Sequence, residues 1–121
     1  MLIYDFEIFK HDTLLGVLNE ETGEIFQSWD IDEIKDFTKK NLNNIWVGYN
    51  SDHYDKILLH GMLTNKLNNE DKIFECSTVI IGAQDDNIPI FNLLNKFNIS
   101  DYYQSPILSY DLLGDRFIFF T

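Results

Sequence analysis

The first segment of the chain has the alternation typical of a β-strand. Residues 2–9 are rich in strand-forming residues, and a period of two places Ile3, Asp5, Glu7 and Phe9 on one face. The opposite face is apolar throughout. Because both faces carry large apolar groups, the pattern predicts a central strand of a sheet.

The next segments predict a hairpin followed by a helix. Residues 13–19 and 24–29 flank the sequence EETGE, whose glycine can supply the positive φ of a turn. Asp30 stands three residues before Glu33, which is the spacing of a capping box, and apolar residues then recur at helical intervals. We therefore expect two strands and then a helix over residues 31 to about 41.

A strand and a second helix are expected to follow. The apolar run NIWVGY (44–49) predicts a short buried strand. Ser51 is a suitable N-cap for a helix in which Tyr54, Leu58 and Met62 lie on one face.

The second half of the chain has a weaker pattern. Residues 70–81 fit a helix, although their β-branched end also fits a strand, and residues 82–87 predict a loop. Pro89 suits the first turn of a helix over about residues 88–97, and residues 107–113 predict a last strand.

Composition limits the class of protein. At 121 residues and 45% hydrophobic content, the chain fits a single α/β domain with a mixed sheet over residues 1–121. Its net charge of -11, from 20 acidic and 9 basic residues, repels phosphate backbones unless a divalent metal or a basic patch intervenes. The one cysteine, Cys76, excludes an intramolecular disulfide, and no apolar run is long enough to span a membrane. We expect a cytoplasmic protein with no membrane partner.

The two carboxylates of the first segment carry the candidate chemistry. On a strand, Asp5 and Glu7 project to the same side about 6.6 Å apart at the backbone, close enough to share divalent cations. Carboxylate oxygens favour Mg²⁺ or Mn²⁺, and two such ions can support phosphodiester hydrolysis. The alternative is an exposed strand whose acids face water.

A second motif, GYNSDHYDKILL, follows at residues 48–59. Together the two motifs resemble the DEDD-type 3′-to-5′ exonucleases of the ribonuclease H-like fold, particularly the proofreading domains of B-family and phage-type DNA polymerases. Asp5 and Glu7 match the first motif of that family. The second motif is matched by Gly48, Tyr49, Asn50, Tyr54 and Asp55. The separation of the motifs and the intervening hairpin, helix and strand also match.

The resemblance implies a role for each matched residue. Asp5 and Glu7 would bind metal, and Asp55 would help hold a second Mg²⁺ or Mn²⁺ ion, directly or through water. Asn50 and Tyr54 would belong to the substrate-binding region, with Asn50 orienting the substrate or the Asp55 carboxylate and Tyr54 packing in the helix. The implied substrate is the 3′ end of single-stranded nucleic acid.

The sequence departs from the family at its last motif. The family has a fourth catalytic Asp, preceded by Tyr four residues earlier or by His five residues earlier, and no Tyr or His here has an Asp at that distance. The domain is therefore interpreted as lacking the final helix of the family, with Asp111 or Asp115 as a possible substitute acid. With one metal ligand missing, weak or no turnover is expected.

Two functions remain open at this point. One is an exonuclease-like domain, and the other is a non-catalytic, acidic, phage-derived interaction protein that inhibits a basic nucleic-acid-binding host protein such as a CRISPR effector nuclease. The net charge, the missing acid and the apolar segment RFIFFT (116–121) favour the second function. That segment could complete the sheet or form a homodimer. Both interpretations predict a phage or prophage protein in the cytoplasm of a bacterial host.

Overall fold

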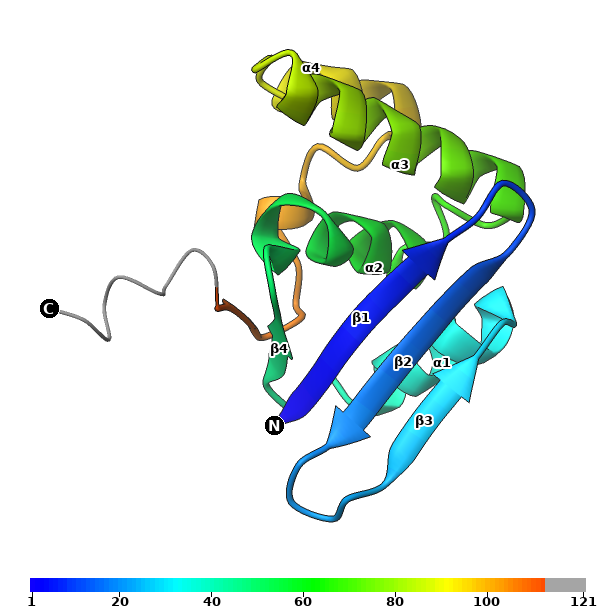
Figure 1. Cartoon of the computed structure of the whole chain (residues 1–121), viewed down its shortest axis with the longest axis vertical. Helices are drawn as coiled ribbons and strands as arrows, with labels where there is room; N and C mark the ends of the chain where they lie inside the picture. Colours follow the sequence, from blue (N-terminus) through cyan, green and yellow to red (C-terminus); the bar gives the residue numbers. More distant parts are fainter. Residues whose placement is uncertain (113–121) are drawn as a thin grey trace, which may run out of the picture.

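The computed structural model describes residues 1–112 of the chain, which form an α/β fold with a five-stranded mixed sheet (Figure 1). The predicted α/β class is confirmed. The strands are β1 (Leu2–Ile8), β2 (Thr13–Asn19), β3 (Ile25–Ser28), β4 (Trp46–Gly48) and β5 (Ser109–Asp111). The α-helices are α1 (Ile31–Lys40), α2 (Asp55–Leu63), α3 (Glu70–Asp85) and α4 (Phe91–Leu94). The short 3₁₀ helices are η1 (Ser51–His53), η2 (Asn95–Phe97) and η3 (Tyr102–Gln104).

The sheet places β1 at its centre. The strand order is β3-β2-β1-β4-β5. β1 pairs antiparallel with β2, which pairs antiparallel with β3, whereas β4 runs parallel to β1 and β5 parallel to β4. The predicted central position of the first strand is therefore confirmed.

The helices α1 and α2 cover one face of the sheet. In Figure 1 they lie behind the strands, and among residues 1–112 no helix crosses the face turned to the viewer. The exposure of β1 alternates accordingly, because Tyr4 and Phe6 are buried on the helix side while Ile3, Asp5 and Glu7 are exposed. We call the second side the open face.

An apolar row crosses the open face. Strand register places Ile25, Leu18, Ile3, Val47 and Tyr110 side by side on five adjacent strands. The first three are 70%, 38% and 43% exposed, whereas Val47 is buried and Tyr110 is half-buried. The open face therefore presents aliphatic groups to solvent at one end, where an ordinary solvated sheet would carry polar ones.

Aromatic contacts centred on Trp46 hold α1 against the sheet. The Trp46 ring meets Tyr4 edge-on at 5.3 Å between centroids and Phe37 at 5.9 Å. Phe37 in turn stacks on Phe26 of β3 at 3.9 Å. The indole Nε1 donates to the Asn41 carbonyl oxygen at 3.1 Å, so the polar atom of this buried ring has a partner.

The sequence pattern of residues 70–81 fitted either a helix or a strand, and in the structure this segment belongs to the helix α3. Its residues Ile73, Cys76, Ile80 and Ala83 recur at intervals of three and four, and all are buried. The Asn69 side chain caps the helix by accepting from a backbone N–H in the first turn. Packing of this apolar face outweighs the weak helix preference of the β-branched end.

Several predicted boundaries are wrong. Ser51 does not cap α2 but begins η1, and Tyr54 takes the N-cap position with no side-chain capping bond. The loop predicted for residues 82–87 is helical as far as Asp85. The helix predicted for residues 88–97 is confined to α4 and η2, after Pro89.

The last strand is shorter than predicted, covering residues 109–111 in place of 107–113. Asp115 and the segment RFIFFT lie outside the described residues. In residues 1–112, no helix has the length and apolar character needed to cross a membrane.

Candidate metal-binding site at the carboxyl end of the sheet

The strand alternation of β1 places both motif acids on the open face. Asp5 lies opposite Gly16 of β2, and Glu7 lies opposite Leu14. No atom outside the immediate chain neighbours stands within 4 Å of where a Cβ on Gly16 would be, so the sheet is hollowed beside Asp5. Both carboxylates are exposed.

Asp55 reaches this region from the other motif. It is the first residue of α2, which follows β4 after a turn in which Asn50 adopts a positive φ of 56°. Asn tolerates this left-handed conformation better than most residues. In the structure, Asn50 therefore serves to turn the chain between β4 and η1. The Asp55 side chain is buried, and its Oδ1 accepts a hydrogen bond from the Phe6 backbone N–H at 3.3 Å. This bond joins residues 49 positions apart and holds Asp55 against β1, at a residue between Asp5 and Glu7.

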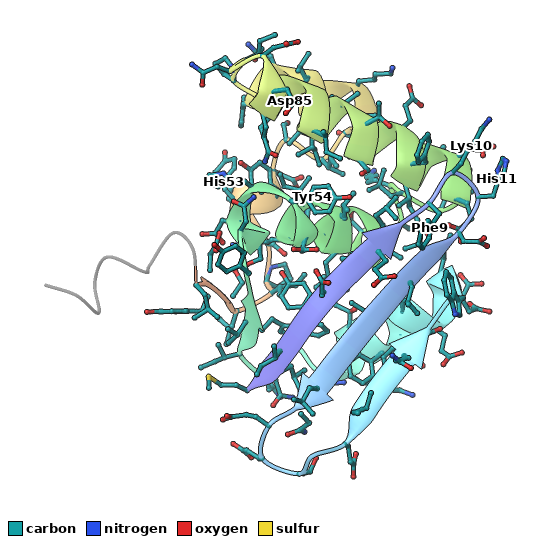
Figure 2. All side chains as sticks on the ribbon, in the orientation of Figure 1. Phe9, Lys10, His11, His53, Tyr54 and Asp85 are labelled. Atoms are coloured by element: carbon teal, nitrogen blue, oxygen red, sulfur yellow. The ribbon has the colours of Figure 1, made fainter. Side chains whose placement is uncertain are left out.

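Tyr54 has a structural partner. Its hydroxyl lies 2.6 Å from the Ser77 hydroxyl of α3, and the side chain is half-buried (Figure 2). This contact fits the predicted packing role. The tyrosine thus links α2 to α3 immediately beside Asp55.

A third acid, Asp111, approaches from β5. It pairs with Gly48 at the carboxyl end of β4 and is 1% exposed. Its Oδ2 accepts from the Asp52 backbone N–H at 2.9 Å. Asp111 therefore stands at the same end of the sheet as Asp5 and Asp55.

The charges of these acids are coupled. The pKa of the Asp55 carboxyl is raised to about 7, first by burial and then by the charges of Asp5 and Asp111, while the hydrogen bond from Phe6 opposes the rise. The pKa of the buried Tyr4 hydroxyl is raised by burial and then by the charge of Asp55. A cation among these oxygens would relieve the repulsion between the carboxylates.

The donor set fits a hard cation in part. Carboxylate oxygens of Asp5 and Asp55 suit Mg²⁺ or Mn²⁺, with water as the remaining ligands. Glu7 lies on the same face, one alternation further along β1. Within residues 1–112, no three Asp, Glu, His or Cys side chains stand close enough together to enclose a metal ion.

Sequence reasoning missed the neighbourhood of Asp55. Strand alternation places Tyr4 on the helix side of β1, where the sequence pattern gives no sign that it differs from an ordinary core residue. The Phe6 backbone N–H carries no side-chain signal at all. Both are found only once β1 and α2 are brought together.

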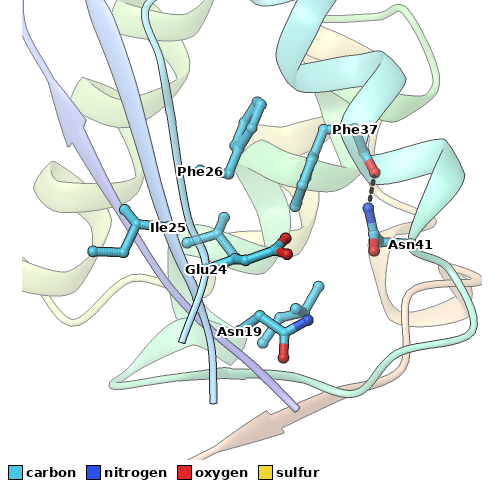
Figure 3. A pocket seen from close by; sticks show the side chains of 8 residues that line it. Asn19, Glu24, Ile25, Phe26, Phe37 and Asn41 are labelled. Atoms are coloured by element: carbon cyan, nitrogen blue, oxygen red, sulfur yellow. Dashed lines mark hydrogen bonds between the residues drawn. The ribbon is translucent and has the colours of Figure 1, made fainter. Parts of the chain in front are cut away.

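A separate cavity of about 240 Å³ lies at the opposite end of the sheet, between β2, β3 and α1 (Figure 3). Its polar groups serve local structure. Asn19 Oδ1 accepts from the backbone N–H groups of Glu21 and Thr22, and Asn41 Nδ2 donates to the Phe37 carbonyl oxygen. The cavity therefore adds no group to the acidic site.

Comparison of the chain with known protein families, with curated proteins and with solved structures found no match.

Proposed function

We propose that the protein is a metal-dependent exonuclease-type domain that acts on 3′ ends of single-stranded nucleic acid, related to the DEDD-type exonucleases of ribonuclease H-like fold. The observation that carries this proposal is the hydrogen bond from the Phe6 N–H to Asp55. It joins the two motifs that the sequence holds far apart.

The order of elements supports the proposal. A strand bearing Asp5 and Glu7 is followed by a hairpin partner, a helix, a parallel strand and the helix that begins with Asp55. The carboxyl end of parallel strands is where α/β sheets commonly bind ligands. Asp5, Asp55 and Asp111 all stand there.

In this function Asp5, Glu7 and Asp55 would hold Mg²⁺ or Mn²⁺. Such ions stabilise the charge that develops on phosphate oxygens and lower the pKa of bound water. The residues of the chain orient the site, because Asp55 is held by the Phe6 N–H and Tyr54 is held by Ser77.

In the family that the two motifs resemble, a fourth acid completes the site. Asp111 is a candidate substitute, but register places it in the row of Tyr4 and Gly48, on the helix side of the sheet. Asp111 can therefore support Asp55 directly. It is less able to act together with Asp5 and Glu7, because these two residues face the open side.

A cleavage assay tests the proposal. We expect 5′-labelled single-stranded DNA or RNA to shorten from its 3′ end in Mn²⁺ and to stay intact in EDTA. The double variant Asp5→Ala, Glu7→Ala should fall to background. The matched control is Glu20→Ala, Glu21→Ala, which removes the same charge from the exposed β2–β3 turn and should cleave like the wild type. No metal-dependent cleavage by the wild type, or equal cleavage by the Asp5, Glu7 variant, contradicts the proposal.

We also propose a second function, an acidic inhibitor that binds a basic nucleic-acid-binding protein. The apolar row beside Asp5 on the open face favours it, because an exposed apolar patch next to acids suits a basic protein surface. A complex with a basic nuclease should form at low salt and dissociate as ionic strength rises. A complex that is insensitive to salt would contradict an electrostatic inhibitor.

A further inference from the structure

Phe9 and Trp29 form an exposed aromatic pair at one end of the sheet. Their rings are stacked at 6.2 Å between centroids with 29° between planes, and the residues are 49% and 54% exposed. By contrast, the buried rings of Phe26 and Phe37 stack at 3.9 Å and 12°. The outer pair is thus looser and leaves much aromatic surface in solvent.

The pair continues the face that carries the motif acids. Glu7 pairs with Leu14, and Leu15 pairs with Ser28, so the next residue after β3, Trp29, falls in the row of Glu7 and Leu14. Phe9 lies two residues beyond Glu7, which is about 7 Å along an extended chain. Figure 2 shows Phe9, Lys10 and His11 together at the turn that joins β1 to β2.

Local packing does not account for both rings. A shallow groove runs from Trp29 past the first turns of α1 and α3, and its polar groups include Asp30 and Asn69. These two side chains already cap their helices. The groove accounts for the position of one edge of the Trp29 indole. It gives no packing role to Phe9 or to the exposed surface of the two stacked rings.

We propose that the Phe9–Trp29 pair is a stacking platform for unpaired bases of single-stranded nucleic acid whose phosphates reach the Asp5 and Glu7 carboxylates. This inference rests on the proposed exonuclease function. Base stacking on aromatic rings tolerates any base, because every base has a π-face. Phosphate charge would be met by divalent metal at the acids and by Lys10 at the turn.

Fluorescence of Trp29 gives a direct readout. The other tryptophan, Trp46, is fully buried, so a quench on binding reports Trp29. We expect an oligothymidine of about ten nucleotides with phosphorothioate linkages to quench the emission in Mg²⁺ at moderate salt, and an abasic strand of equal length and linkage to have little effect. The cleavage-resistant linkages keep the measurement independent of turnover, and Mg²⁺ supplies the charge that the phosphates need at Asp5 and Glu7.

Variants test the platform separately from the fold. Phe9→Ala should weaken oligothymidine binding at least about fivefold, and Trp29→Ala should do so in an anisotropy assay with labelled strand, while Trp29→Phe keeps a ring and most of the affinity. Phe91→Ala is the matched control, because Phe91 pairs with Tyr103 at 6.1 Å and is 48% exposed elsewhere on the surface. It should bind like the wild type. Circular dichroism checks that each variant is folded.

The outcomes separate the platform from the proposed function. Cleavage by the wild type without quenching would overturn the platform alone, and quenching without cleavage would support the platform while contradicting the exonuclease. Equal loss of binding in Phe91→Ala would also overturn the platform. Quenching by a Lys/Arg-rich peptide but not by oligothymidine would overturn it in favour of a basic protein segment that binds at the Phe9–Trp29 pair.

Discussion

At the scale of single residues, Asp55 is a buried carboxylate whose ionisation costs the fold stability. Its pKa is raised to about 7 from an ordinary value of 3.8. Between about pH 4 and pH 7 the unfolded chain loses this proton while the folded chain keeps it, so the free energy of unfolding falls as pH rises through that window. Above about pH 7 the whole cost is present, on the order of 4 kcal/mol.

We therefore predict that Asp55→Asn stabilises the metal-free protein at about pH 8 and changes little at about pH 4. The amide oxygen of the substituted side chain can still accept from the Phe6 N–H, so the bond that holds α2 is kept. Thermal unfolding in EDTA measures the effect, with Asp36→Asn as an exposed control. Mn²⁺ should raise the melting temperature of the wild type but not of Asp55→Asn. A variant that follows the wild type at every pH would contradict a costly Asp55.

The acids themselves could be predicted from spacing, because alternation in β1 and the position of the second motif are local features. Asp5 and Glu7 share the open face, as a period of two requires. The cost at Asp55 could not be predicted, since it depends first on burial of Asp55 in the folded chain and then on the nearby charges of Asp5 and Asp111. Ser51 failed as a predicted cap for a similar reason, because η1 intervenes before α2.

At the scale of elements, a hydrogen bond between the side chains of Tyr54, at the start of α2, and Ser77 of α3 adds to the apolar packing of the two helices. We predict that Tyr54→Phe lowers the free energy of unfolding by about 1 to 2 kcal/mol, because the buried Ser77 hydroxyl loses the partner that lies at 2.6 Å. Ser77→Ala should cost a similar amount. The double variant should cost less than the sum, since no polar group is then left unpaired.

Urea denaturation measures this cycle. Tyr49→Phe is the matched control, because Tyr49 is 63% exposed and its hydroxyl can bond to water. It should leave the midpoint unchanged. Strict additivity of the Tyr54 and Ser77 substitutions would show that the two hydroxyls do not stabilise the helix pair together.

Elements with a strong local signal could be predicted, and weaker ones needed the tertiary structure. The α1 cap is an example, since Asp30 Oδ1 accepts from the Glu33 N–H at 3.0 Å as the spacing predicted. The α3 segment was ambiguous because its β-branched residues favour strands, and burial of Ile73 and Ile80 against the core decides for a helix. Local preference alone could not supply that contact.

At the scale of the whole molecule, the sequence predicted a central first strand but could not show that one face of the sheet is open in the described residues. Ile3, Leu18 and Ile25 look like core residues in the pattern, yet they form the exposed part of the apolar row. Hydrophobicity along a strand reports that a face is apolar, and only the placement of helices reports whether it is covered.

The two-layer arrangement makes a last prediction. Ile25 and Leu15 are both strand residues, but Ile25 is 70% exposed on the open face and Leu15 is fully buried under the helices. Leu15→Ala should lower the free energy of unfolding by about 3 kcal/mol through lost packing. Ile25→Thr keeps a β-branched side chain and should change stability by less than about 0.5 kcal/mol. Denaturant midpoints of the two variants measure the difference. If Ile25→Thr costs as much as Leu15→Ala, the apolar row is packed in the folded protein and cannot serve as a surface for nucleic acid or a basic partner.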